Sequence, residues 1–339
     1  MKLYLLLVLV TSAGAAVEFV DILRGVSPNR NAFSYGNVLP LVAVPRGTAR
    51  WGVSTDDDLF NAWWVDPQST HFAGIRCTNE PSPWMGDFGQ FLIRPFINNV
   101  SPVFRFPRTF PDEAFAPHLI NVTFLNMCSE AGCARMELTP ADHGALISIT
   151  IPKDIDGDRY ISFHPADGII SSASDSLLQG YSAHLSHKGA VNFSHYFSAK
   201  FEFGGDTKGT FLHDLTNNRI GWTKIDGAEK EVVLIRIGTS YISSSQATLN
   251  AVNEQGYTSF DKMTEKNKAA WDAILSRVVV PSDAPLHKKR TLYTSLYRSL
   301  LFPQDLSEID NQGNRVHYSP YDSMGRVFPG RISTNSGFW

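Results

Sequence analysis

The sequence has few cysteines and no excess of positive charge. Its 339 residues include 3 Cys, 30 Lys and Arg, and 33 Asp and Glu, and charged residues make up only 19%. A net charge of -3 without a basic stripe argues against a nucleic-acid partner, because such surfaces rely on clustered Lys and Arg. No apolar run approaches the roughly 20 residues of a membrane helix, so we expect no membrane span.

What is present is typical of a folded protein with a large core. Hydrophobic residues make up 43% of the chain, and there are 22 Phe, 11 Tyr and 7 Trp. A chain of 339 residues is long enough for two domains, since single cores usually stop growing near about 250–300 residues.

The N-terminus, MKLYLLLVLVTSAGAA, has the pattern of a secretory signal peptide over residues 1–16. Lys2 precedes a short apolar run from Leu3 to Val10, and small residues follow up to Ala16. We therefore expect a secreted, extracellular protein. Three glycosylation sequons agree with this expectation, and their acceptor residues are Asn99, Asn121 and Asn192.

The cysteines allow one local disulfide. Cys128 and Cys133, in CSEAGC, are close enough in the sequence to bridge in an oxidising compartment, which leaves Cys77 over. The pair lacks the matching His or Cys partners of a zinc motif, so we predict a structural bridge.

The chain from residue 17 to about 240 predicts an all-β sandwich. Its short runs of Val, Ile, Phe and Tyr are separated by Gly, Pro, Asn and Asp, as in ALISITIP (145–152) and EVVLIRIG (231–238). DIDGD (154–158) resembles the start of a calcium loop but has Pro165 where the closing acid belongs, so we expect a turn between strands. His184 and His187 have no acidic third ligand nearby.

After residue 240 the pattern becomes helical. Apolar residues recur at helical spacing between 243 and 278, with Thr258 and Ser259 as candidate N-caps. A further helix is predicted over 285–302, with Pro285 in its first turn and an apolar face that includes Leu292 and Tyr297. The remaining residues read as a loop, and helix faces without an evident partner lead us to expect a fragment of a longer protein.

Ordered blocks of this sequence resemble the N-terminal part of the glycoside hydrolase family 92 α-mannosidases. The likeness runs from about residue 33 to 339. The blocks that carry it include YGNVLPLVAVPRG (35–47), FAGIRCTNEPSPWMGDFGQFLI (72–93), LYTSLYRSLLFPQ (292–304) and NSGFW (335–339).

The resemblance implies a mainly β fold: an N-terminal, galactose-mutarotase-like β-sandwich, then linker helices, then the start of an (α/α)6 barrel that is truncated here. The corresponding ranges are 17–240, 241–283 and 284–339. It also implies a calcium-dependent, inverting, exo-acting α-mannosidase that acts on mannose-containing glycans. The catalytic acid and base and most calcium ligands of the family are expected beyond Trp339, so the fragment alone is expected to be inactive.

The loop RCTNEPSPWMGDFG (76–89) is the strongest candidate for sugar contact. A mannose ring suits one rigid aromatic plate beside fixed hydrogen-bonding groups, which fits Trp84 and Asp87. Arg76, Cys77 and Thr78 are expected to line the same wall. From the residues alone, a core plug is the preferred interpretation of Trp84 and a turn cap that of Asp87; the resemblance favours sugar contact. At Asn79-Glu80 the sequence departs from the commoner family forms, which puts the linkage preference of this subsite in question.

Other candidates border the same pocket. One of the adjacent Trp63 and Trp64 is expected in the core and the other at the surface, since neighbours on a strand face opposite ways. Trp64 and His71 are taken as candidate substrate contacts, although a His in such a position is more often a structural hydrogen-bonding residue than a functional one. Trp339 is a further candidate substrate contact, since it closes the GFW motif, which in the family precedes a sugar-binding Asp.

Two other readings stay open. The chain is alternatively a stand-alone lectin-like module that binds glycans through Trp84 without hydrolysis, or a purely structural domain. The coding sequence beyond Trp339 distinguishes the lectin from the enzyme.

Overall fold

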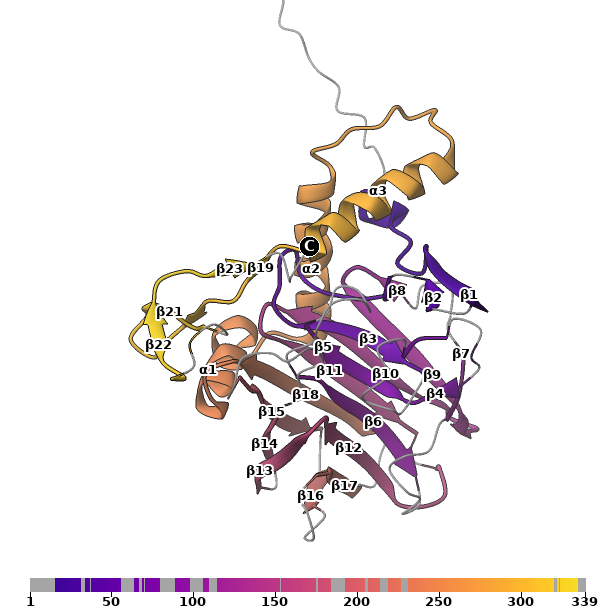
Figure 1. Cartoon of the computed structure of the whole chain (residues 1–339). Coiled ribbons are helices and arrows are strands. Elements are labelled where there is room, and N and C mark those ends of the chain that lie inside the picture. The colour runs from indigo at the N-terminus through magenta and orange to yellow at the C-terminus, as the bar shows by residue number, and fades with distance from the viewer. Residues whose placement is uncertain are drawn as a thin grey trace, which may run out of the picture.

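The computed structural model describes most of the chain after the predicted signal peptide. The described residues are 16–31, 34–36, 38–55, 64–66, 69, 71–79, 89–97, 106–109, 115–152, 154–174, 176–183, 193–204, 207–213, 219–226, 231–319, 322 and 324–334. Two antiparallel β-sheets pack face to face, and three helices described in the C-terminal half lie against one end and one side of this sandwich (Figure 1). The mainly β prediction is therefore confirmed.

The larger sheet contains ten of the described strands. In spatial order they are β13 (Gly168–Ser174), β14 (Leu177–Ser182), β15 (His195–Phe203), β18 (Glu231–Ser240), β11 (Gly144–Ile151), β10 (Gly132–Ala141), β9 (Leu119–Ser129), β7 (Phe106–Thr109) and β4 (His71–Phe72), with β8 (Phe115–Ala116) also paired to β9. Cys128 and Cys133 face each other across the β9–β10 hairpin and form a disulfide. Residues 154–158 form the predicted turn, between β11 and β12.

The smaller sheet has six described strands. Their order is β16 (Lys208–His213), β17 (Gly221–Asp226), β12 (Arg159–Pro165), β6 (Phe91–Ile97), β5 (Gly74–Thr78) and β3 (Arg50–Ser54). Minor elements are η1 (Ala16–Phe19), the pairs β1 (Val26–Asn31) with β2 (Ser34–Gly36) and β19 (Gln304–Asp305) with β23 (Ser333–Thr334), and a three-stranded sheet of β20 (Glu308–Ile309), β21 (Arg315–Tyr318) and β22 (Val327–Pro329).

The core lies between the two sheets and is filled by alternate residues of each strand. Trp51 of the smaller sheet meets Phe91 edge to face at 5.7 Å between ring centroids, and Phe91 lies 4.8 Å from Phe197 of the larger sheet. All three rings are fully buried. Each such ring stabilises the fold by about 2–3 kcal/mol through burial of apolar area.

The first two helices cover the outer face of the larger sheet. They are α1 (Ser244–Gln255) and α2 (Phe260–Leu275), and Ser259 caps α2 as predicted. Helix α1 lies so close to β18 that a Cβ on Gly238 would be 1.8 Å from the carbonyl oxygen of Ala247. Asn267 of α2 donates its side-chain amide to Pro140 of β10 at 2.6 Å.

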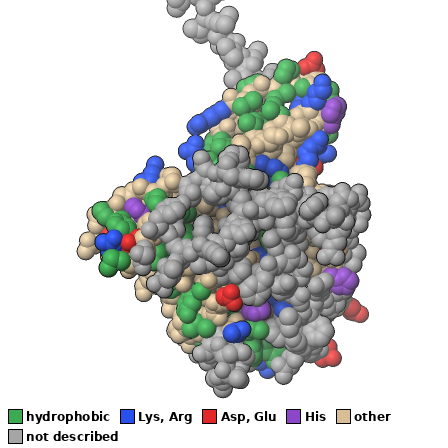
Figure 2. All heavy atoms as spheres, viewed as in Figure 1, with side chains coloured by type: hydrophobic (Ala, Val, Ile, Leu, Met, Phe, Trp, Pro, Cys, Tyr) green, Lys and Arg blue, Asp and Glu red, His purple; other side chains and the backbone are tan. Residues whose placement is uncertain are grey.

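Helix α3 (Leu286–Leu301) packs against the extended segment that precedes β3. The Tyr297 hydroxyl donates to the Leu41 carbonyl at 2.5 Å, and the Trp271 indole of α2 donates to the Ala43 carbonyl at 2.8 Å. Leu292, predicted on the apolar face of this helix, is 38% exposed, whereas Tyr297 is fully buried. Figure 2 shows hydrophobic and basic side chains together over this helical region.

No helix in the described part of the chain is both long enough and apolar enough to cross a membrane. The signal-peptide prediction for 1–16 falls almost entirely outside the described residues, as do Asn99 and Asn192. Asn121 is described, on β9. Secretion and glycosylation stay predictions.

Candidate functional site

The loop that joins β5 to β6 is described only at its two stems. Trp84 and Asp87 fall outside the described residues, as does Trp339, and their sugar contacts stay predictions. The first stem ends at Asn79 and the second begins at Gly89. The structure therefore shows how the loop is held at its base.

The predicted wall residues divide between the two faces of the smaller sheet. Cys77 pairs in register with Trp51 and Phe91 and belongs to the core between the sheets. Arg76 and Thr78 alternate with it and project from the opposite face. All three predicted wall residues are fully buried, and Cys77 does not share a face with the other two.

Arg76 is held by side chains on both sides of its strand. Its guanidinium donates to Gln90 Oε1 at 2.9 Å and to Ser54 Oγ at 3.3 Å. It also lies 4.9 Å from the centroid of the Trp64 ring, a cation–π distance. Arg76 thus links the second stem of the loop, through Gln90, to β3.

The two other predicted contacts lie in different surroundings. Trp64 is 1% exposed and packs over Gly52, where a Cβ would be 2.5 Å from the indole. His71 is exposed on β4, at the edge of the larger sheet. The structure brings Trp64 to Arg76 but places His71 on the other sheet. Trp63 is outside the described residues.

The first stem of the loop is fixed to the C-terminal part of the chain. The Asn79 carbonyl accepts hydrogen bonds from Arg50 at 2.5 Å and from the Gln304 side-chain amide at 3.2 Å. Arg50 also donates to the carbonyl of Leu301, the last residue of α3. Since Arg50 and Gln304 are 0% and 2% exposed, these bonds lie in a buried junction between sandwich and helix.

The second stem is packed against β15. Gly89 has a φ of 102°, and a Cβ there would be 2.5 Å from Cβ of His195. Only glycine fits this backbone conformation and this contact. The side-chain amide of Asn79 donates to the Gly89 carbonyl at 3.4 Å, so the two stems are also joined to each other.

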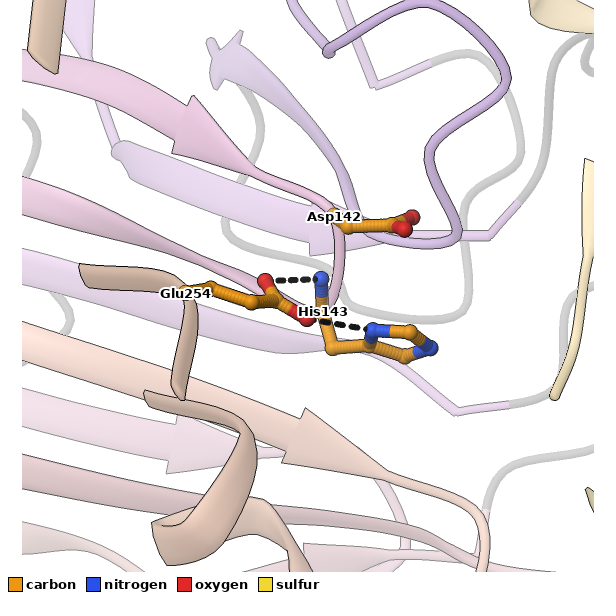
Figure 3. A group of neighbouring side chains, drawn as sticks. All are labelled: Asp142, His143 and Glu254. Carbon is orange, nitrogen blue, oxygen red and sulfur yellow. Dashed lines mark hydrogen bonds and ion pairs between the residues drawn. The ribbon is translucent and has the colours of Figure 1, made fainter. Parts of the chain in front are cut away.

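A cluster of ionisable side chains occupies the same end of the sandwich. Asp142 and His143 form the turn between β10 and β11, and Glu254 comes from the last turn of α1 (Figure 3). One Glu254 oxygen lies 2.6 Å from His143 Nδ1, and the other accepts the His143 backbone N–H at 2.8 Å. The Glu254 carboxylate thus binds the β10–β11 turn to α1.

The electrostatics of this cluster favour a charged imidazole. Burial alone lowers the pKa of His143, but the carboxylate of Glu254, with smaller effects from Asp142 and Glu308, outweighs burial and raises the pKa to about 10. Burial raises the pKa of Asp142 and of Glu308. Glu308 is nevertheless well bonded, since it accepts from the Tyr241 backbone and from the Asn250 side chain.

The cluster does not fit calcium. Calcium takes six to eight oxygen ligands, whereas Asp142, His143 and Glu254 include a nitrogen, and both Glu254 oxygens are already hydrogen-bonded to His143. Asp142 Oδ1 accepts the Thr48 backbone N–H at 3.2 Å. We interpret the group as an ion-pair network at the junction of the turn, α1 and the C-terminal part.

Sequence reasoning did not single out Asp142, His143, Glu254 or Glu308. The turn residues Asp-His-Gly indicate only a hairpin, and an acid on a helix is ordinary. No spacing signal connects them, because 111 residues separate His143 from Glu254. Only the packing of α1 on the larger sheet brings them together.

The comparisons with known proteins match one family over both parts of the chain. Residues 19–269 match the family described as "Glycosyl hydrolase family 92 N-terminal domain", and residues 246–339 match the family described as "Glycosyl hydrolase family 92 catalytic domain". Because these matches cover most of the chain, it belongs to glycoside hydrolase family 92. Its predicted resemblance to that family is confirmed.

Solved structures of the family share the fold. An inverting family 92 mannosidase of Bacteroides thetaiotaomicron superposes with a TM-score of 0.81 and 28% identity, over 96% of this chain and 44% of that one. A family 92 α-mannosidase of the same organism, solved in complex with mannoimidazole, gives 0.73 and 18%, over 94% of this chain and 43% of that one. This chain thus spans less than half the length of either protein. No curated protein matches the sequence.

Proposed function

We propose that the chain is the N-terminal part of a secreted, exo-acting α-mannosidase that inverts the configuration of the sugar it releases. The single observation that carries this proposal is the family match across residues 19–339, supported by the 28% identity to an inverting mannosidase. The substrates proposed are mannose-containing glycans, in keeping with the mannoimidazole bound by a more distant relative.

The role proposed for this chain is to supply one wall of the sugar site. The loop between β5 and β6 carries Trp84 as an aromatic plate and Asp87 as a hydroxyl acceptor. What supports this role is the base of the loop: its stems are buried and hydrogen-bonded to β3 and β19, as a rigid sugar site requires.

The chemistry proposed for the whole protein needs two carboxyl groups. An inverting glycosidase uses one as an acid toward the leaving oxygen and one as a base toward water, about 6.5–9.5 Å apart. We propose that both come from the catalytic domain beyond Trp339. Calcium is proposed as the cofactor, also with most of its ligands there, since the one cluster of His and acids found among the described residues does not suit it.

The test is hydrolysis of an aryl α-mannoside by the full-length protein, with an aryl β-mannoside and an aryl α-glucoside as controls. We expect turnover of the α-mannoside alone, loss of turnover with a calcium chelator, and recovery on adding calcium. The chain of residues 17–339 is expected to show no turnover.

The coding sequence downstream of Trp339 tests the rival reading first. A continuation into an (α/α)6 domain is expected. A stop codon together with mannoside binding but no hydrolysis would replace the enzyme by a lectin-like module.

A further inference from the structure

The stem residue Asn79 is where the sugar-binding loop meets the region matched by the catalytic domain. Its carbonyl accepts from Arg50 of β3 and from Gln304 of β19. Gln304 lies three residues after the end of α3, and Arg50 also donates to the last carbonyl of that helix. The end of α3 and the start of the loop are therefore joined by side chains that contact both.

The side chains of the junction are closed to water. Asn79 is 3% exposed, Gln304 is 2% exposed, and Arg50 is fully buried. The Asn79 carbonyl accepts from both side chains, and the loss of either donor weakens the bonding that fixes this buried group. A loss at Gln304 or Arg50 should therefore move Asn79.

Movement of Asn79 would be passed to the other stem. Its side-chain amide donates to the Gly89 carbonyl, and Gly89 is packed against His195 without space for a Cβ. The next residue, Gln90, donates its backbone N–H to Ser182 Oγ, and its side-chain oxygen accepts from Arg76. The loop base is thus one hydrogen-bonded unit, and Arg50 and Gln304 connect it to α3 and β19.

We propose that Arg50 and Gln304 are positioning residues, which fix the position of the sugar-binding loop relative to the catalytic domain. This inference rests on the proposed function, because it takes the loop between β5 and β6 as a wall of the mannose site. Neither side chain touches the reacting atoms. Each acts through Asn79, and both hold the loop relative to α3.

Helix α3 offers a matched control. Tyr297 makes a buried side-chain hydrogen bond from the same helix to the Leu41 carbonyl. Tyr297→Phe removes this bond without touching Asn79. Gln304→Leu removes the bonds that the Gln304 amide donates to the Asn79 and Thr48 carbonyls, with little change in volume. A comparison of the two separates an effect on the loop from a general weakening of the junction.

The experiment measures kcat and KM of the full-length protein with an aryl α-mannoside, and amide hydrogen exchange of the peptide that covers residues 79–90. We expect Gln304→Leu and Arg50→Met to lower kcat/KM at least about tenfold, as a small displacement of a binding group does, and to speed exchange in that peptide. Arg50→Lys, which keeps the charge, should recover part of the loss. Tyr297→Phe should change kcat/KM less than about twofold.

Each outcome decides the proposal. If Tyr297→Phe lowers kcat/KM and speeds exchange in 79–90 as much as Gln304→Leu does, Arg50 and Gln304 only stabilise the junction and the inference fails. If the unaltered protein does not cleave mannosides, the proposed function fails, and the exchange comparison alone then decides whether Gln304 fixes the stem. Faster exchange confined to the Gln304 and Arg50 variants supports the inference; equal exchange overturns it.

Discussion

His143 Nδ1 lies 2.6 Å from an oxygen of Glu254, which ties the β10–β11 turn to the last turn of α1. The imidazole side chain is 7% exposed and the carboxylate 23% exposed. Removing one partner of a buried pair leaves the other uncompensated. We predict that Glu254→Gln lowers the pKa of His143 and destabilises the fold by about 2–3 kcal/mol, somewhat below the value for a fully buried pair.

Chemical denaturation at pH 7 measures the stability part of this prediction, and NMR titration of His143 measures its pKa. Glu265→Gln, at an exposed position of α2, is the matched control and should leave both unchanged. An unshifted His143 titration in Glu254→Gln would show that the pair does not hold the charge.

The same pair makes stability depend on pH above neutrality. In the folded state the pKa of His143 is about 10, against 6.5 for the unperturbed side chain. The folded protein binds the extra proton between these values, so this contribution is complete below about pH 6.5 and is lost as pH rises toward 10. The unfolding free energy of His143→Asn, measured from pH 6.5 to 9.5, should therefore fall less steeply than that of the unaltered protein. Parallel curves would contradict the assignment.

His195 should make the stability of the fold fall as pH decreases, opposite to the effect of His143. Burial lowers its pKa to about 4, so the unfolded chain binds the proton more readily between about pH 6.5 and 4. Its contribution to stability is complete above 6.5 and is lost as pH falls through that window. His195→Phe, which keeps a ring beside Phe91 and Tyr241, should resist acid unfolding better than the unaltered protein. An unchanged acid midpoint would count against this role.

The contact of α1 with β18 predicts a position that tolerates no side chain. Gly238→Ala would place a methyl group 1.8 Å from the Ala247 carbonyl oxygen, a backbone atom that moves only with the helix. We expect a loss of about 2–4 kcal/mol in unfolding free energy by urea denaturation. Gly204→Ala, where the nearest atom is 3.5 Å away, is the control and should cost less than about 1 kcal/mol. Equal effects would show that α1 shifts freely on the sheet.

The fold was largely predictable because its signals are local. The alternating run at 145–152 became β11 (Gly144–Ile151), since one face of that strand packs into the core. Ser259 was recognisable as an N-cap because its hydroxyl accepts a hydrogen bond from a backbone N–H only three residues further along the chain. The burial of two arginines on the smaller sheet, Arg50 and Arg76, had no local signal in the sequence. Both are charged residues on strands, and their burial depends on distant segments that cover them.

The candidate site was less predictable for the same reason. Trp64 was assigned to the pocket from its neighbourhood in the sequence, but the structure stacks it over Arg76 at 1% exposure. His71 is seven residues before Thr78 yet lies on the other sheet, since β4 pairs with β7 whereas β5 pairs with β3 and β6. Sequence proximity does not determine which sheet a strand joins.

The proposed inverting mannosidase activity is tested most directly with the full-length protein and an aryl α-mannoside. Proton NMR identifies the anomer of the sugar that is released first. We predict β-mannose as the first product, with turnover reduced at least about tenfold in Trp84→Ala and unchanged in Tyr257→Ala, an exposed control in the connection between α1 and α2. First release of α-mannose, or full turnover in Trp84→Ala, would contradict it.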